Sequence, residues 1–139
     1  MISTCNELRT DKIVVIKENK RVFRIKNSSD FNINTVTVDG CYITTGLKCD
    51  FLFEIINNEE IEKVFYVELK GSDVAHGIQQ LEATLRHCLS EHKSFSRECY
   101  IVASRVPKSS TSSQNQKKEF RRKNRVSLFI DTNQKEVVV

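Results

Sequence analysis

The sequence lacks any long apolar segment. Its first twelve residues include Asn6, Glu7, Arg9 and Asp11, so we do not expect them to form a signal peptide. No uninterrupted apolar run approaches the roughly 20 residues that cross a bilayer. Hydrophobic residues make up 39% of the chain and charged residues 29%, which is typical of globular proteins. We therefore expect a cytoplasmic protein with no membrane partner.

The cysteines and histidines lack the spacing of metal or disulfide sites. The five cysteines are odd in number, and no two of them form a C-x-x-C motif. We expect reduced thiols that pack as small buried hydrophobic side chains. No paired carboxylates accompany the three histidines, so we expect them on the surface, where contact with phosphate is an alternative. The residues concerned are Cys5, Cys41, Cys49, Cys88, Cys99, His76, His87 and His92.

The length of 139 residues favours a single domain that spans residues 1–139 and needs no cross-links. Internal repeats are absent. We divide the chain into a β-rich N-terminal part (1–35), a core that carries an acidic motif (36–104), and a C-terminal part with a basic helix and the final strands (105–139).

Apolar periodicity predicts the secondary structure. Residues 73–91 carry apolar side chains at 3.6-residue spacing, which predicts a helix capped by Ser72 or Asp73. A polar helix is predicted over 114–123, after a flexible segment at 109–113, and residues 1–10 are predicted to form a helical turn or an irregular start. Strands are predicted at 13–17, 22–26, 31–38, 41–43, 48–54, 64–71, 98–104, 126–130 and 136–139.

The predicted helix at 73–91 joins two strands, which implies a right-handed parallel crossover. The fold class is therefore α/β or α+β, with a mixed β-sheet flanked by helices and a β-rich N-terminal extension. Gly77 in the helix interior costs about 1 kcal/mol relative to alanine. This cost predicts that the helix closely approaches the sheet or a ligand at that point.

A β-hairpin is predicted from strands 48–54 and 64–71, which flank a polar turn. A turn centred between residues 58 and 59 places Asp50 opposite Val67 or, with one residue of slip, opposite Glu68. Opposed carboxylates repel each other, so this arrangement adds no stability by itself. It favours a bound cation, and carboxylate oxygens with water are the ligands that Mg²⁺ prefers.

Strand alternation places Tyr66, Glu68 and Lys70 on one face and Val67 and Leu69 on the other. The hairpin and the helix after it follow a recognisable order. Asp50 stands at the start of one strand, the returning strand carries Glu68-x-Lys70, and Gly71 and a capped helix follow. This pattern resembles the PD-(D/E)XK nuclease superfamily. The likeness covers about residues 36–104, and the string VELKGSDVAH is similar to small stand-alone members of that superfamily. It implies the restriction-endonuclease-like fold, whose core is a helix, three antiparallel strands, a helix and a fourth strand.

The resemblance also implies a set of roles. Asp50, Glu68 and the main-chain carbonyl of Leu69 would hold Mg²⁺ or Mn²⁺, which lowers the pKa of a bound water and neutralises charge on phosphate. Lys70 would position or deprotonate that water. Gln80 would orient the water or the phosphate, and helix geometry lets only one of Gln79 and Gln80 face the site.

Two features depart from the superfamily pattern. No N-terminal helix is convincing, and Glu7 is the only candidate there for a further metal-binding acid. The Q-x-x-x-Y motif of an exonuclease branch is absent, because Ala83 and Thr84 stand four residues after Gln79 and Gln80.

A basic tract follows the core. Residues 105–125 hold eight Lys or Arg and one acid, a net charge of +7, which leaves −3 for the rest of the chain. Such segregation favours a polyanionic partner, although a solvated helix face is the alternative. We expect nucleic acid to contact the six residues of this basic tract, Lys117, Lys118, Arg121, Arg122, Lys123 and Arg125.

The sequence therefore predicts a metal-dependent nuclease, an endonuclease acting on DNA. One small domain offers little surface for substrate selection, so we expect a homodimer or a partner subunit. A non-catalytic nucleic-acid-binding or regulatory protein on a nuclease-like fold is an alternative. A protein-interaction subunit whose basic tract docks on an acidic partner is another, but neither alternative needs the acidic pair and its lysine.

Overall fold

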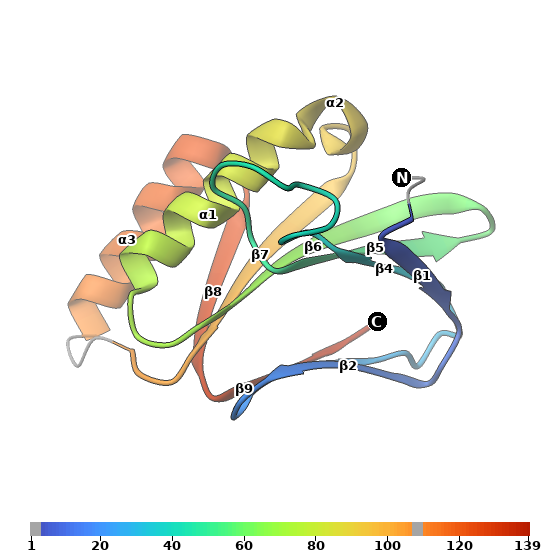
Figure 1. The fold of residues 1–139 in the computed structure, drawn as a ribbon, viewed down its shortest axis with the longest axis horizontal. Coiled ribbons are helices and arrows are strands. Elements are labelled where there is room, and N and C mark those ends of the chain that lie inside the picture. The colour runs from blue at the N-terminus through green and yellow to red at the C-terminus, as the bar shows by residue number, and fades with distance from the viewer. Residues whose placement is uncertain (1–3, 107–109) are drawn as a thin grey trace.

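The computed structural model describes residues 4–106 and 110–139, with nine strands and three helices in that part of the chain (Figure 1). Among those residues, no helix is long and apolar enough to cross a membrane. The strands are β1 (Asn6–Arg9), β2 (Ile13–Glu18), β3 (Arg21–Lys26), β4 (Asn32–Thr37), β5 (Phe51–Asn57), β6 (Glu60–Lys70), β7 (Ser96–Ala103), β8 (Ser127–Thr132) and β9 (Gln134–Val138). The helices are α1 (Val74–His87), α2 (Leu89–His92) and α3 (Ser110–Asn124).

A six-stranded mixed sheet forms the centre of the fold, in the order β1-β4-β5-β6-β7-β8. Strands β1, β4, β5 and β6 pair antiparallel, whereas β6, β7 and β8 pair parallel. The parallel crossover from β6 through α1 to β7 is therefore confirmed, and so is the mixed α and β composition with a sheet-rich core.

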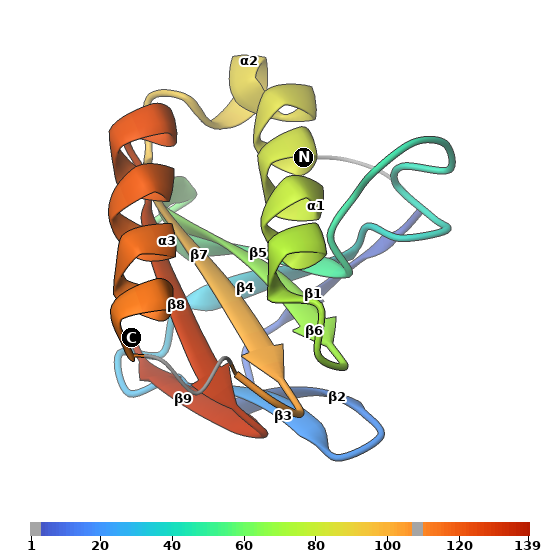
Figure 2. The same ribbon diagram turned by 90° about the vertical axis from the view of Figure 1, so that its left-hand side faces the viewer.

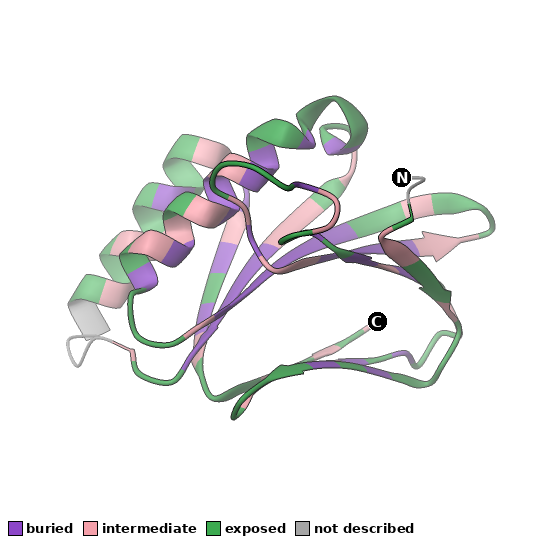
Figure 3. Cartoon of the chain, viewed as in Figure 1, coloured by how far each residue is buried: buried purple, intermediate pink, exposed green. Residues whose placement is uncertain are grey.

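The sheet is covered differently on its two faces. Helices α1 and α3 lie over one face, and a small sheet in the order β2-β3-β9 lies over the other (Figure 2). Because side chains alternate along β6, Val64 and Tyr66 join the apolar cluster under the helices, while Phe65 and Val67 join the cluster between the sheets. Burial is accordingly concentrated along the central strands (Figure 3).

Helix α1 begins and ends for local reasons. The side chain of Asp73 accepts a hydrogen bond from the backbone N–H of His76, which confirms the predicted cap. The helix is interrupted at Cys88 before the short α2, so the predicted single helix is divided in two. A Cβ added to Gly77 would lie 3.3 Å from Ile101 Cδ1 and 3.6 Å from Glu68 Cγ, so the predicted close approach to the sheet is confirmed.

Three local predictions are wrong. Residues 6–9 form strand β1 and no helical turn, because they pair with β4. Residues 41–43 form no strand, and only an isolated bridge joins Asp39 to Ile43. Helix α3 begins at Ser110, so residues 110–113 are helical, while residue 109 lies outside the described residues.

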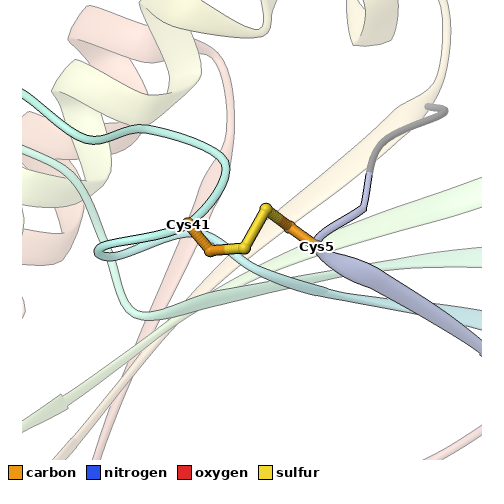
Figure 4. Close-up of a disulfide and its surroundings, with 2 residues drawn as sticks. All are labelled: Cys5 and Cys41. Atoms are coloured by element: carbon orange, nitrogen blue, oxygen red, sulfur yellow. A yellow bond between two sulfur atoms is a disulfide. The ribbon is translucent and has the colours of Figure 1, made fainter.

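The expectation of reduced thiols is wrong for two of the five cysteines. Cys5 and Cys41 form a disulfide (Figure 4). The pairing of β1 with β4 brings Cys5 beside the loop after β4, and the Cys5 carbonyl accepts a hydrogen bond from Thr37 N–H. Cys49, Cys88 and Cys99 are free and buried, as predicted. Disulfides are more typical of oxidising compartments, so the cytoplasmic location stays a prediction.

His92 is also misplaced by the sequence, because it is fully buried and not on the surface. Its Nε2 lies 2.6 Å from Glu54 Oε2, and its Nδ1 lies 2.5 Å from the Tyr66 hydroxyl. Glu54 Oε1 also accepts a hydrogen bond from Asn34 Nδ2 at 2.8 Å. These hydrogen bonds join His92 of α2 to the central strands and give each of these buried polar side chains a partner.

Candidate functional site

Asp50 and Glu68 meet at one end of the β5–β6 hairpin. The register of the two strands shifts by one residue between Ile55 and Ile56, so that Phe51 pairs with Val67. One step further along this register, Asp50 lies beside Glu68. Of the two predicted registers, the strands therefore follow the one with a residue of slip, which places Asp50 beside Glu68 and not beside Val67. The slip arises because a bulge near the turn inserts one extra residue in β6.

Backbone hydrogen bonds hold Asp50 in place. Its Oδ2 accepts the N–H of Leu69 at 2.8 Å. Its carbonyl oxygen accepts the N–H of Val38 at 2.9 Å and of Asp39 at 3.3 Å. Asp50 is half-buried and fixed from both sides, so its carboxylate needs no rearrangement before it binds a ligand.

Glu68 is buried on the face of β6 that α1 covers, with only 2% of the residue exposed. Its Oε2 lies 4.0 Å from Lys70 Nζ, and its Oε1 is buried without a hydrogen-bond partner. An unpartnered buried carboxylate oxygen is costly. In native proteins such an oxygen is completed by an ordered water, an ion or a ligand.

The electrostatics of the pair follow from this burial. Burial raises the pKa of Asp50 to about 6. Burial, together with the neighbouring charge of Asp50, raises the pKa of Glu68 to about 9, even though Lys70 acts in the opposite direction. At neutral pH these pKa values favour a pair in which Asp50 is ionised and Glu68 holds a proton, and a bound cation would favour ionisation of both.

Gln80 lies on α1 at the loop that precedes Asp50. Its Nε2 donates to the carbonyl oxygen of Lys48 at 3.1 Å, and its Oε1 is buried without a partner. The N–H of Cys49 donates to Thr84 Oγ1 at 2.8 Å, so α1 holds this loop at two points. Gln79 is exposed, which leaves Gln80 as the glutamine on the inner side of the helix.

The donor set fits a divalent cation of the Mg²⁺ type. Asp50 and Glu68 offer hard oxygen ligands, and one of these oxygens has no other partner. In the described part of the chain, no group of three or more His, Cys, Asp and Glu residues could hold a metal. Two carboxylates with water and substrate oxygens are nevertheless a usual Mg²⁺ environment. The part assigned to the Leu69 carbonyl stays a prediction.

Glu7 does not join the acid pair. It is exposed on the edge strand β1 opposite Thr35, which in turn pairs with Phe53. It therefore lies two strands away from β5 and three positions along the strand from Asp50. The reason is that residues 6–9 form a strand at the sheet edge and not a helix over the sheet.

Asp39 is the nearby acid that the sequence did not reveal. It raises the pKa of both Asp50 and Glu68, although burial is the larger cause for each. Its Oδ1 lies 3.8 Å from Lys48 Nζ. The Asp-Gly turn after β4 gave no signal of this proximity, because it depends on how the 38–50 loop folds back against β5.

Five of the six residues of the basic tract lie along the second half of α3, and Arg125 follows the end of that helix. Lys123 Nζ lies 3.2 Å from Glu82 Oε2, Arg122 forms an ion pair with Glu119, and Arg121 donates to a serine hydroxyl of β8. The two lysines at the start of the tract line a shallow pocket over β8. Half of the tract is therefore already engaged with the protein itself.

The structure does not bring the whole basic tract to the acid pair. Arg125 precedes β8, in which Ser127 pairs with Glu98 and thus aligns with Phe65 of β6. Three residues of a parallel strand, about 10 Å, separate that position from Glu68, and β8 lies two strand spacings of about 4.8 Å each from β6. The far end of the tract could contact only a distant part of an extended ligand.

No family model matches the chain, and no curated protein or solved structure is significantly similar to it. The functional conclusion therefore rests on the geometry of this site.

Proposed function

We propose that the protein is a metal-dependent nuclease that hydrolyses phosphodiester bonds, with DNA as its substrate. The observation that carries this proposal is the buried carboxylate of Glu68, which faces Asp50 and has an oxygen without a partner. This arrangement does not stabilise the hairpin, because burying a carboxylate oxygen without a partner costs folding free energy. A cation between the two carboxylates removes that cost.

Each residue has a distinct part in this proposal. Asp50, held by the Leu69 N–H, and Glu68 bind Mg²⁺ or Mn²⁺. The ion supplies Lewis acidity toward phosphate and a bound water of lowered pKa. Lys70 lies 4.0 Å from Glu68, so its ammonium group can hold the attacking water by a hydrogen bond and can stabilise the negative charge that develops on the phosphate. Gln80 positions the loop that carries Asp50.

The proposal extends to the remaining surface. The exposed members of the basic tract on α3 would contact phosphates away from the scissile bond, which steepens the salt dependence of binding. One domain of this size binds only a short stretch of duplex, so a homodimer or a partner subunit would complete the substrate path. The restriction-endonuclease-like form of the fold belongs to the same proposal, since the strand order and the β6–α1–β7 crossover are compatible with it.

A cleavage assay with Mg²⁺ and with Mn²⁺ tests the proposal on single-stranded, double-stranded and branched DNA and on RNA. We expect cleavage that a chelator abolishes. Lys70→Ala should lower its rate by about 10²–10⁴-fold, the usual contribution of a positioned acid or base. Lys63→Ala is the matched control, because this exposed lysine lies on the same strand away from the site.

Calorimetric titration with Mg²⁺ and Mn²⁺ provides a second readout that does not depend on the substrate. If the wild-type protein binds neither metal and cuts no nucleic acid, the enzyme proposal is wrong. Salt-sensitive DNA binding that Asp50→Ala leaves unchanged, without cleavage, would instead establish the non-catalytic alternative.

A further inference from the structure

Arg21 brings a second cation to the site from the other sheet. It begins β3 in the small sheet, and its Nη1 donates to Ser104 Oγ at 3.0 Å. The N–H of Ser104 in turn donates to the carbonyl oxygens of Lys70 at 3.1 Å and Gly71 at 2.8 Å. The guanidinium therefore lies at the end of the main sheet where Lys70 lies, and Figure 2 shows the β2–β3 turn beneath the ends of β6 and β7.

The same turn is within electrostatic reach of the acid pair. Glu18 pairs with Arg21 across the β2–β3 hairpin. Burial is the main cause of the raised pKa of Asp50, and the charge of Glu18 adds to it. The β2–β3 turn is thus near enough to Asp50 for its charges to act on it, although it lies about thirty residues earlier in the sequence.

The Arg21 side chain has hydrogen-bonding capacity left over. Only 11% of the side chain is exposed, and its Nε is buried without a partner. Its ion pair with Glu18 spans 3.9 Å, which is longer than a hydrogen bond. A guanidinium has five donors in a planar fork, and burying them unpaired is costly. The Nη2 group, which makes only this long ion pair, is left to donate to an anion, and a phosphate oxygen is a strong acceptor for a guanidinium N–H.

We propose that Arg21 binds a phosphate next to the scissile one, so that the substrate is a polynucleotide strand and not a small isolated phosphodiester. This inference rests on the proposed nuclease function. Lys70 and the two carboxylates would act on the reacting phosphate. Arg21 belongs to the small sheet, and its hydrogen bond to Ser104 holds it at the end of the main sheet where Lys70 lies. The strand would enter between the β2–β3 turn and the first turn of α1.

Arg21→Gln tests this assignment, with Lys20→Gln as the matched control. Lys20 is exposed in the same turn, and its substitution removes the same charge. We expect Arg21→Gln to raise KM for an oligonucleotide by about 10–100-fold, the usual value of charged hydrogen bonds. In Ca²⁺, the slope of log binding constant against log salt should fall by about 0.7–0.9. The kcat for the oligonucleotide should be unchanged. The rate of hydrolysis of bis(p-nitrophenyl) phosphate, which has a single phosphate, should also be unchanged.

The possible outcomes separate this inference from the nuclease proposal. If the wild type cleaves DNA and Arg21→Gln behaves as Lys20→Gln does, the inference is wrong and the nuclease proposal stands. Equal losses on the oligonucleotide and on the small diester would also overturn it. If the wild type binds no metal and cuts nothing, both proposals fail.

A second variant covers the case in which Arg21→Gln does not fold. Ser104→Ala leaves the guanidinium in place and removes only its anchor. We expect a several-fold rise in KM for the oligonucleotide with the same kcat, and Arg21→Lys should restore part of the affinity lost in Arg21→Gln. An unchanged KM in Ser104→Ala contradicts the assignment.

Discussion

Two buried glutamates of the same hairpin have opposite environments. Glu54 on β5 is 1% exposed and Glu68 on β6 is 2% exposed. Burial alone would raise the pKa of Glu54, but hydrogen bonds from His92 and Asn34 outweigh it and the pKa is lowered. Glu68 has no comparable partners, and burial raises its pKa to about 9. The two glutamates are therefore equally buried, and what distinguishes Glu54 from the proposed metal ligand Glu68 is its hydrogen bonds to neighbouring side chains.

The comparison predicts opposite phenotypes for the two glutamates. Glu68→Gln should reduce metal-dependent cleavage to background, because an amide is a poor ligand for a hard divalent cation. Its thermal midpoint without metal should equal or exceed that of the wild type, because the amide removes the cost of burying a carboxyl whose Oε1 has no hydrogen-bond partner, and the contact with Lys70 that is lost spans 4.0 Å. Cleavage assays measure the loss of activity, and thermal unfolding of the same preparation measures the change in the midpoint. Wild-type activity in Glu68→Gln would remove this residue from the site.

Glu54→Ala should have the reverse effect. Removing one member of a buried hydrogen-bonded network typically costs about 1–3 kcal/mol of folding free energy for each polar group left without a partner, here His92 and Asn34. Denaturant unfolding measures this loss, with the exposed Glu62→Ala as a control on the same hairpin. The metal affinity of the folded fraction should be unchanged. A loss of metal binding without loss of stability would contradict the structural role of Glu54.

The pH dependence of stability sharpens the contrast. Because the pKa of Glu68 is raised in the folded state, the folded protein holds a proton that the unfolded chain releases. Stability without metal should therefore fall as pH rises from about 4.5 toward 9. We expect Glu68→Gln to remove the part of this slope above about pH 6, where the raised pKa of Asp50 no longer contributes, and to gain about 1–3 kcal/mol at neutral pH, since a tenfold change in proton affinity corresponds to about 1.4 kcal/mol. Mg²⁺ should stabilise the wild type more at high pH, because the metal must displace that proton.

A series of denaturant titrations between pH 5 and 9, with and without Mg²⁺, measures this effect. Equal slopes in the wild type and Glu68→Gln would show that the carboxyl is solvated or otherwise partnered. Glu54 gives the opposite sign, since its lowered pKa contributes stability that is lost as pH falls.

The β5–β6 hairpin and α1 could be predicted because their signals are local. The alternation of side chains along a strand places Glu68 and Lys70 on one face, independently of the rest of the fold. Asp73 caps α1 through a hydrogen bond from a backbone N–H only three residues further along the chain. The register was less certain, because a single bulge moves Asp50 from Val67 to Glu68. Sequence alone left both pairings open.

Other features could not be predicted, since they depend on contacts between distant segments. The Cys5–Cys41 disulfide exists because β1 pairs with β4, and His92 is buried because α2 folds over Glu54. Neither short segment carries a pattern that distinguishes it from a surface element. The same holds for Arg21, whose hydrogen-bond partner Ser104 is 83 residues away in the sequence.

The sequence by itself determined which side chains share the hairpin face, the presence of the crossover helix and the segregation of positive charge. These properties follow from turn chemistry, periodicity and composition, which act over a few residues. The tertiary structure decided which buried carboxylate has partners, that the far end of the basic tract lies away from the acid pair, and that Arg21 stands at the same end of the sheet as Lys70. These outcomes depend on how sheets and helices pack, because packing alone fixes distances between residues far apart in the chain.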